Sequence, residues 1–277
     1  MTIRLVATDL DGTLLRSDGT VSPRSRAALA AAEAAGLVVV FVTGRPPRWL
    51  DDVVEQTGHL GVAVGANGAV IYDLHSASVV ESHTLSPGTA HTVATAIRTR
   101  FANVAYAVEY LDGFGAEEGY IHDWAVNPDF DRRGNPVPPA RVGDIAEIAD
   151  RPLLKLLVKD RAVKGRDVDE FLAEADRLLA GRATITHSSS FGLLELAAPG
   201  VTKASGLAEV ASQHGIAADE VVAIGDMPND IPMLQWAGTS YAVGNAHRSV
   251  RAAADSVVGS NDEDAVAEVI EGLLARS

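Results

Sequence analysis

The stretch VATDLDGTLL, residues 6–15, holds two aspartates, Asp9 and Asp11, on either side of a single leucine. The residues that lead into them, Ile3 to Thr8, are apolar and rich in β-branched side chains, which predicts a short buried strand. Burying carboxylates costs free energy unless they are paired or bind a cation. A buried strand that delivers two carboxylates to one place therefore indicates a functional site at its end.

The segments that follow predict the class of fold. Residues 22–36 read as a helix, because Ser22 is a good cap, Pro23 suits the first helical position and Gly36 suits the end. LVVVFVTGR, residues 37–45, is a second continuous apolar strand. Continuous apolar strands separated by helices are typical of a parallel sheet covered on both faces. We predict an α/β fold with a Rossmann-like, doubly wound parallel sheet.

Both ends of the chain show this alternation of apolar strands and helices, whereas the middle of the chain has a different pattern. The further core elements expected are a strand with an NG turn at 61–73, helices at 203–215, 229–238 and 263–277, and strands at 220–226, 240–246 and 255–261. In the middle, strands resemble antiparallel sheet, and residues 127–143 read as loop from their Pro, Gly and Asn content. We expect an α/β core from residues 1–83 and 198–277 and an inserted α+β module at 84–197.

Composition narrows the function classes. The 277 residues carry 23 Lys and Arg against 37 Asp and Glu, a net charge of −14, and show no run of basic residues, so nucleic-acid binding is not expected. The chain has no cysteine, which excludes disulfides and thiolate chemistry and fits a reducing cytoplasm. We expect no signal peptide, because charged residues interrupt the N-terminal apolar run. We expect no membrane association, because no apolar stretch is long enough to span a membrane.

Polar side chains recur where the predicted parallel strands end. Asp9 and Asp11 follow the first strand, Thr43 to Arg45 follow the second, and GDMPND, residues 225–230, follows a later one. Ligands of open parallel sheets bind at the carboxyl ends of the strands, so these residues are expected to meet. Oxygen ligands suit a hard cation such as Mg²⁺, and no His/Cys cluster competes for a softer metal. Lys203, at a helix start, could neutralise phosphate charge there.

Four ordered motifs, DLDGT, VTGR, GVTK and GDMPND, make the chain resemble the haloacid dehalogenase-like hydrolases, in particular the Cof-type phosphatases of subfamily IIB with a large C2-type cap. The resemblance covers nearly the whole chain. It implies that Asp9 is the nucleophile, that Asp11 is general acid and base, and that Thr43 and Lys203 bind and stabilise the phosphoryl group. It also implies a Mg²⁺ site formed by Asp9, Asp11 through its carbonyl, Asp226, and Asp230 directly or through water.

Other positions are candidates for phosphate or substrate binding, namely Leu10, Gly44, Arg45, Asn67, Lys155 and Asn229. The Leu10 side chain is expected to point into the core. Asn67 either forms an NG turn or lies near the mouth of the site, and Arg45 either approaches substrate or pairs on the surface. Lys155 interrupts an apolar strand, which predicts either a solvent-facing lysine or a substrate contact from the cap.

A second DGT triplet, at residues 18–20, is interpreted as a tight turn, because no strand delivers Asp18. The first triplet does not belong to an EF-hand calcium loop. Counted from Asp9, such a loop needs Gly at its sixth position and Glu at its twelfth, where this sequence has Leu14 and Thr20.

The function predicted from the sequence is a Mg²⁺-dependent phosphoric monoester hydrolase. Its substrate would be a small phosphorylated metabolite, a sugar phosphate in the first instance, and the chain would act as a monomer or homodimer. Two alternatives stay open: a phosphomutase or phosphotransferase that uses the same residues, and a phosphate-binding regulator without turnover. A hydrolase admits water to the site when the predicted cap is closed, whereas a phosphomutase or phosphotransferase does not. The choice of substrate is expected to depend on the cap.

Overall fold

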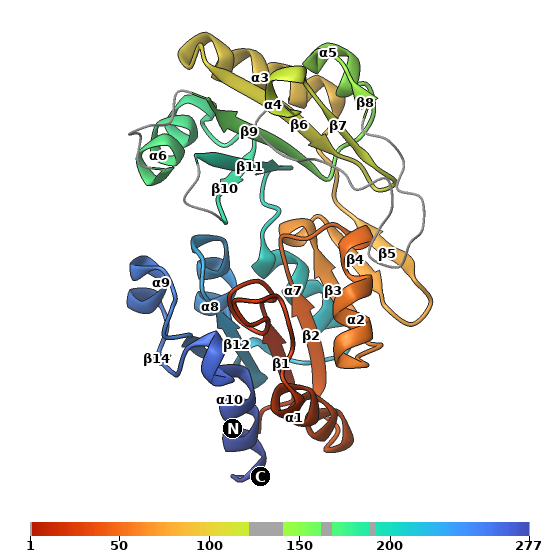
Figure 1. Cartoon of the computed structure of the whole chain (residues 1–277), viewed down its shortest axis with the longest axis vertical. Coiled ribbons are helices and arrows are strands. Elements are labelled where there is room, and N and C mark those ends of the chain that lie inside the picture. The colour runs from red at the N-terminus through yellow and green to blue at the C-terminus, as the bar shows by residue number, and fades with distance from the viewer. Residues whose placement is uncertain (1, 122–140, 162–167, 189–191, 277) are drawn as a thin grey trace. The chain divides into compact units, whose positions relative to one another are not determined.

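The computed structural model describes residues 2–121, 141–161, 168–188 and 192–276 (Figure 1). The chain forms two compact units. The first unit joins both ends of the chain, Met1–Glu81 and Thr202–Ser277, and the second unit is the intervening segment Ser82–Val201. That the first unit is a catalytic core and the second a cap remains a prediction.

An eight-stranded sheet forms the centre of the first unit. Its strands, in spatial order, are β14 (Ser256–Val257), β13 (Thr239–Ala242), β12 (Val221–Gly225), β1 (Leu5–Thr8), β2 (Val38–Val42), β3 (Val62–Gly65), β4 (Val70–Asp73) and β5 (Ser78–Ser82). The strands from β14 to β3 pair in parallel, and β4 runs antiparallel to β3. The predicted α/β class with a parallel core sheet is confirmed.

The strand order places a topological switch beside β1. The chain passes outward from β1 to β2 and β3, and later returns through β12 to β13 and β14 on the other side. Thr8, the last residue of β1, pairs with Phe41 of β2 and Ile224 of β12. The three strands therefore end at nearly the same level, at the position where open α/β sheets bind ligands.

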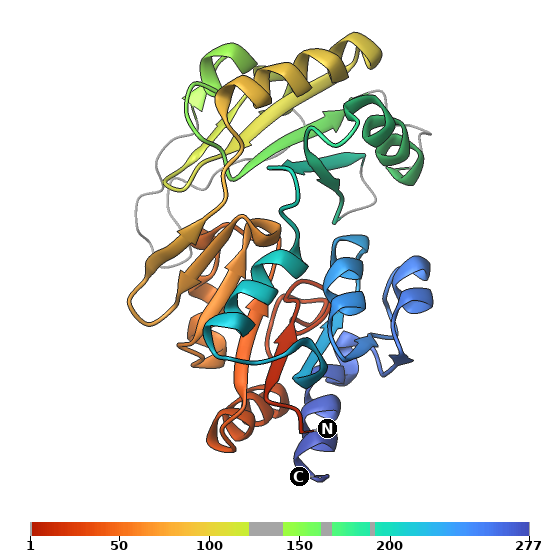
Figure 2. The same ribbon diagram turned by 180° about the vertical axis from the view of Figure 1, so that it is seen from behind.

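Helices cover both faces of this sheet. They are α1 (Pro23–Ala34), α2 (Asp51–Thr57), α7 (Lys203–Gln213), α8 (Ile231–Trp236), α9 (Arg248–Ala253) and α10 (Ala265–Leu274). Figure 1 shows α1 beside α10 on one face, and Figure 2 shows α7 crossing the other. Single-turn 3-10 helices add η1 (Pro47–Trp49), η2 (Ala66–Gly68), η3 (Ala218–Glu220), η4 (Pro228–Asp230) and η5 (Asn261–Glu263).

The helix starts follow from the capping residues in the sequence. The Ser22 hydroxyl accepts a hydrogen bond from the Ser25 N–H at the start of α1, and Pro23 occupies the first turn. At the start of α7, the Thr202 hydroxyl accepts from the Ser205 N–H while the Ser205 hydroxyl accepts from the Thr202 N–H. This reciprocal cap fixes the first residue of α7, Lys203, against the sheet edge.

The second unit is built on a six-stranded sheet. Its strands, in spatial order, are β10 (Thr184–Thr186), β11 (Leu193–Ala197), β9 (Lys155–Asp160), β6 (Val104–Glu109), β7 (Phe114–Ala116) and β8 (Arg141–Val142). All pairs are antiparallel except β7 with β8. The helices are α3 (Pro87–Arg100), α4 (Glu118–Ile121), α5 (Ile145–Ile148) and α6 (Val168–Leu179), and a hydrophobic cluster joins α3, α5 and α6 to the sheet.

Two local predictions need adjustment. The predicted strand at 61–73 is two strands, β3 and β4, that turn at Asn67. Most of the predicted loop at 127–143 lies outside the described residues, but β8 occupies its last part, where two residues are too few to leave a periodic pattern. Among the helices of the described residues, none is both long and apolar enough to cross a membrane.

Candidate active site

Asp9 continues β1 at the topological switch. Its backbone N–H donates to the Ile224 carbonyl at 3.0 Å, which extends the sheet pairing by one residue, and its side chain is buried. The Leu10 side chain is fully buried in the hydrophobic core, as expected. The Leu10 carbonyl accepts from the Leu15 N–H at 2.8 Å. Leu10 can therefore offer a ligand only its backbone N–H.

The Asp11 side chain, in contrast, is 58% exposed and paired with an arginine. The Arg45 guanidinium donates through Nε to Asp11 Oδ2 at 2.7 Å and through its terminal nitrogen to Oδ1 at 2.5 Å. Burial lowers the pKa of Arg45, but the hydrogen bond to Asp11 and the charge of Asp11 have the larger combined effect, so the Arg45 pKa lies above its ordinary value. Arg45 thus pairs with Asp11, one of the predicted catalytic residues, and its predicted approach to the substrate stays a prediction.

The first DGT triplet has two roles that the sequence did not reveal. Gly12 adopts φ +81°, and a Cβ there would lie 2.4 Å from Asp226 Oδ2. The Thr13 hydroxyl donates to Asp226 Oδ1 at 3.2 Å. The position of Gly12 and Thr13 directly after the motif aspartates was the available signal, but only the fold shows that they meet a residue more than 200 positions away.

Lys203 links the two motif carboxylates at the base of the site. Its ammonium is 1% exposed and donates to Asp9 Oδ1 at 2.5 Å and to Asp230 Oδ1 at 2.6 Å. Burial lowers the pKa of a lysine, but the charges of Asp230 and Asp9 outweigh it, so the Lys203 pKa lies above its ordinary value. Lys203 is therefore positively charged throughout the physiological range.

Asp230 has both carboxylate oxygens occupied. Lys203 bonds Oδ1, and Oδ2 accepts the backbone N–H groups of Asp226 and Met227, each at 2.9 Å. Its side chain is fully buried. This arrangement favours a role for Asp230 in holding Lys203 and the loop of Asp226, and contact with a cation through water rather than directly.

Three buried carboxylates, those of Asp9, Asp226 and Asp230, have oxygens within 4.8 Å of one another. Burial raises the pKa of the Asp9 carboxyl to about 7 despite the opposing charge of Lys203. Burial also raises the pKa of Asp226 to about 9, with further contributions from Asp9 and Asp230. One ammonium does not balance three carboxylates, so the cluster lacks positive charge. Buried oxygen donors with an excess of negative charge fit a hard divalent cation.

The end of β2 supplies a hydroxyl to the same edge. Thr43 is fully buried, and its N–H donates to the Val64 carbonyl at 2.8 Å. Its hydroxyl oxygen accepts the Arg45 N–H at 3.1 Å, so the hydroxyl proton can still be donated to a ligand. Gly44 lies against the amide of Asn67, where a Cβ would come within 3.1 Å of Oδ1.

Asn67 and Asn229 meet, although they come from different motifs. Asn67 is buried in a left-handed turn with φ 59° and ψ 32°, so the NG-turn interpretation holds. The Asn229 Nδ2 donates to Asn67 Oδ1 at 3.0 Å. Thus Asn67 both forms the turn and contacts a motif residue of the sheet edge.

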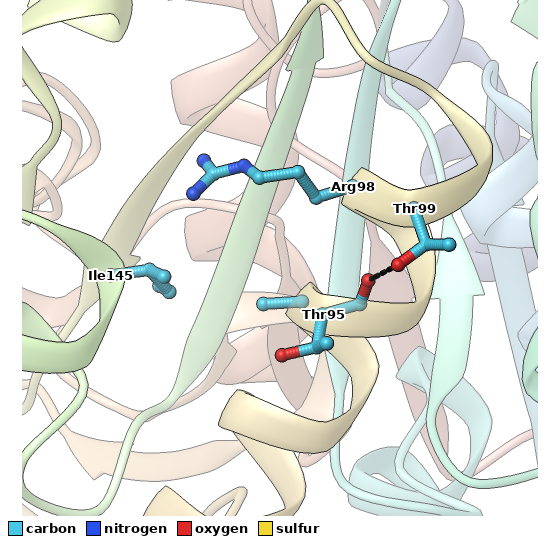
Figure 3. A pocket seen from close by; sticks show the side chains of 5 residues that line it. Thr95, Arg98, Thr99 and Ile145 are labelled. Atoms are coloured by element: carbon cyan, nitrogen blue, oxygen red, sulfur yellow. Dashed lines mark hydrogen bonds between the residues drawn. The ribbon is translucent and has the colours of Figure 1, made fainter.

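Lys155 belongs to the second unit, whereas the other predicted site residues belong to the first. The expectation of a solvent-facing lysine is wrong, because Lys155 is buried on the inner strand β9 and pairs with Glu195 at 2.6 Å. Its predicted contact with substrate stays a prediction. A separate pocket of about 250 Å³ in this unit is lined by Ala94, Thr95, Arg98, Thr99 and Ile145 (Figure 3), and includes no predicted site residue.

A parallel sheet whose switch point presents a buried aspartate, a charged lysine and a carboxylate cluster defines a class of phosphoryl-transfer hydrolase. The comparisons agree: the haloacid dehalogenase-like hydrolase family matches residues 6–270, and the chain belongs to that family.

Curated relatives span the whole chain. The chain is 30% identical to the 5-amino-6-(5-phospho-D-ribitylamino)uracil phosphatase YcsE of Bacillus subtilis, over 97% of this chain and 94% of that protein. It is 28% identical to the pyridoxal phosphate phosphatase YbhA of Escherichia coli, over 98% of each. A solved haloacid dehalogenase-like hydrolase from B. subtilis superposes with a TM-score of 0.80 at 27% identity, over 97% of this chain and 99% of that one.

A solved haloacid dehalogenase subclass IIB sugar phosphatase superposes with a TM-score of 0.79 at 21% identity, over 98% of this chain and 99% of that chain. This similarity supports the same fold. The predicted family, its Cof-type branch and the assignment as a phosphatase are confirmed. The comparisons do not test the roles of individual residues.

Proposed function

We propose that the chain hydrolyses a small phosphorylated metabolite with Mg²⁺ through a phosphorylated Asp9. The observation that carries this proposal is the buried Asp9 carboxylate, held by Lys203 beside Asp226 and Asp230 at the switch point of the sheet. The arrangement supplies a nucleophile, a fixed positive charge and oxygen ligands at one place. These are the components that phosphoryl transfer requires.

The first step forms a bond between a carboxylate oxygen of Asp9 and phosphorus while the bond from phosphorus to the alcohol oxygen breaks. Lys203 already bonds Asp9 Oδ1 at 2.5 Å, so it orients the carboxylate and offsets the charge of the phosphoryl oxygens. Asp11 in its protonated form gives its proton to the departing alcohol oxygen. For this step Arg45 has to release Asp11, because a carboxylate held in two hydrogen bonds carries no proton to give.

The second step breaks the bond between Asp9 and phosphorus. Asp11, now ionised, takes a proton from water as the water oxygen attacks phosphorus, and Asp9 leaves as a carboxylate. The Thr43 hydroxyl donates a hydrogen bond to a phosphoryl oxygen, the backbone N–H of Leu10 offers a further donor, and Gly44 is a proposed contact of the phosphoryl group. Water enters only in this second step, which separates a hydrolase from a phosphotransferase.

Asp9, Asp226 and the Asp11 carbonyl would hold Mg²⁺ directly, and Asp230 would hold it through water. When bound, the cation would neutralise the charge of the cluster and of the transferring phosphoryl group. The fit rests on three buried carboxylates that a single ammonium does not balance.

The substrate we propose is a small phosphate monoester, with sugar phosphates tested first. Two relatives are named for small phosphorylated metabolites, pyridoxal phosphate and a phosphoribitylaminouracil. Asn229 is a proposed polar contact near the metal or the phosphate, and Lys155 is a proposed contact of the rest of the substrate. A cytoplasmic location and the cap role of the second unit remain part of this proposal.

The test is an assay of purified protein with Mg²⁺ on a panel of phosphorylated metabolites, beside two matched variants. Asp9→Asn removes the nucleophile, whereas Asp18→Asn changes the aspartate of the second DGT triplet, which lies in a turn and bonds Thr20. We expect phosphate release that EDTA and Asp9→Asn abolish and that Asp18→Asn leaves unchanged. Release that survives Asp9→Asn would contradict the mechanism, and transfer to an added alcohol in preference to water would indicate a phosphotransferase.

A further inference from the structure

The loop after β1, Asp11 to Leu15, is held from outside by two asparagines. The Asn245 side chain donates through Nδ2 to the Gly12 carbonyl at 2.8 Å. The Asn261 side chain donates through Nδ2 to the Leu15 carbonyl at 2.9 Å. Both donors come from the C-terminal part of the chain, so these contacts are set by the fold and not by local sequence.

The two asparagines are also bonded to each other. Asn245 Oδ1 accepts the backbone N–H of Asn261 at 2.9 Å. Since both ends of the Asn245 amide are engaged, its orientation is fixed, and Nδ2 can only face Gly12. Asn261 is 5% exposed, whereas Asn245 is exposed to solvent. A buried asparagine thus anchors an exposed one, and the exposed one holds the loop.

The peptide between Gly12 and Thr13 is the part of the loop that Asn245 restrains. Gly12 has φ +81°, and a glycine in this region reorients its peptide more easily than other residues. On one side of this peptide lies Asp11, whose carboxylate meets Arg45. On the other side lies Thr13, whose hydroxyl bonds Asp226 Oδ1. A rotation of this one peptide would move both groups.

We propose that Asn245 is a positioning residue for catalysis, acting through the Gly12 carbonyl on Asp11 and on the Thr13–Asp226 contact. This inference rests on the proposed phosphatase function, because it gives Asp11 and Asp226 their roles. Misplacing a catalytic group by about an ångström can cost up to ~100-fold in rate, and groups that orient metal ligands typically contribute about 10- to 100-fold. Asn245 contributes through geometry, without touching the substrate.

A purely structural role for Asn245 predicts different behaviour. The hydrogen bond to Gly12 is exposed to solvent, and the loss of such a bond changes stability only slightly, because water replaces the missing partner. Variants at Asn245 should therefore fold, and a structural role would show only as a small change in melting temperature. A positioning role would change turnover in a folded protein.

The experiment compares Asn245→Asp with Asn245→Ala. Aspartate keeps the oxygen that accepts the Asn261 N–H but replaces the donor to Gly12 with a repelling oxygen, whereas alanine removes both contacts. We expect both variants to lose about 10- to 100-fold in kcat with little change in KM, and aspartate to be at least as impaired as alanine. Gln213→Ala, which removes an exposed amide at the end of α7, serves as the matched control and should behave like the parent protein.

A pair of substrates shows whether the loss passes through Asp11. p-Nitrophenyl phosphate releases an acidic phenol that needs little protonation, whereas an alkyl phosphate such as glycerol 3-phosphate releases an alcohol that needs a proton. The loss in Asn245→Asp should be several-fold larger for the alkyl phosphate.

The outcomes separate this inference from the proposed function. If the parent protein hydrolyses neither these two esters nor any phosphorylated metabolite of the panel, the proposed function fails first. If the parent is active and Asn245→Asp keeps full kcat on both esters, or if aspartate restores what alanine loses, the positioning role of the Gly12 contact is overturned.

Discussion

Lys203 shows how a single side chain determines the chemistry that its neighbours can perform. An ammonium that is 1% exposed would ordinarily lose its proton, but Asp9 and Asp230 bond it directly and keep it charged. The same bonds orient Asp9 toward the sheet edge. Removing one partner of such a buried group costs roughly 3–5 kcal/mol, because the remaining charges lose their compensation. The lysine therefore serves the fold and the site together.

His59 offers a test of pH dependence that is independent of the site. The ring is 2% exposed, packs on Phe41 with ring centroids 4.4 Å apart, and bonds Glu33 at 2.6 Å. Burial lowers the His59 pKa below its ordinary value, outweighing the effect of Glu33. The unfolded chain thus binds the proton more tightly. The stability that neutral His59 contributes is complete above about pH 6.5 and is lost as the pH falls.

The measurement is the free energy of unfolding by urea between pH 8 and pH 5, for the parent protein and for His59→Phe. We expect stability to fall more steeply with decreasing pH in the parent than in the variant, because only the parent has to protonate a buried imidazole. Parallel curves for the two proteins would show that His59 does not titrate differently in the folded and unfolded states.

At the scale of elements, the segment between β1 and α1 carries two glycines in the same backbone conformation but in different surroundings. Gly12 has φ +81° and Gly19 has φ +79°. A Cβ at Gly12 would meet Asp226 Oδ2 at 2.4 Å, whereas a Cβ at Gly19 has no atom within 4 Å. The two DGT triplets thus offer a matched pair of substitutions that differ only in what surrounds the added methyl group.

We expect Gly19→Ala to cost only the strain of a left-handed alanine, about 1 kcal/mol, and to keep activity. Gly12→Ala adds a clash with Asp226 and should lower kcat at least 10-fold while destabilising the protein by roughly 2–4 kcal/mol. Urea unfolding and steady-state kinetics on both variants provide the measurement. Equal effects of the two substitutions would show that the contact with Asp226 is unimportant.

Elements that are buried and continuous could be predicted from the sequence, and short exposed ones could not. Strands β1, β2 and β12 follow from their apolar runs, and α1 follows from its Ser22 cap. Edge strand β5 was missed, because its mostly exposed residues have no apolar periodicity. The solvent-facing alternative for Lys155 was wrong for a related reason: one lysine in an apolar run does not show that a carboxylate from β11, Glu195, will meet it.

At the scale of the whole chain, the order of motifs predicted which strand ends meet, but not the contacts between them. Asp9, Thr43, Lys203 and Asp226 could be placed at one sheet edge because parallel strands bind ligands there. The contacts of Thr13 with Asp226 and of Asn245 with Gly12 join residues more than 200 positions apart and exist only in the folded chain. Hydrogen bonds between loops depend on where each backbone turns, and composition does not encode that.

The balance of charge in the first unit leads to a prediction about its stability. The chain has a net charge of −14, and the carboxylates of Asp9, Asp226 and Asp230 are buried together. The pKa of Asp226 is raised from 3.8 to about 9, chiefly by burial, so the folded protein without a cation holds a proton that the unfolded chain gives up. Its stability therefore falls as the pH rises through this window.

Asp226→Asn removes this carboxylate while keeping the shape of the side chain. In EDTA at pH 8 we expect the variant to be more stable than the parent by roughly 1–3 kcal/mol, because the parent has to take up a proton on this buried carboxyl when it folds, whereas the neutral amide does not. Mg²⁺ should raise the melting temperature of the parent by linkage, and should do so much less in the variant, which has lost a ligand. Thermal melts with EDTA and with Mg²⁺ give both comparisons. A parent protein that gains nothing from Mg²⁺, or a variant that is less stable in EDTA, would contradict a cation site at these carboxylates, since an uncompensated cluster must gain from either change.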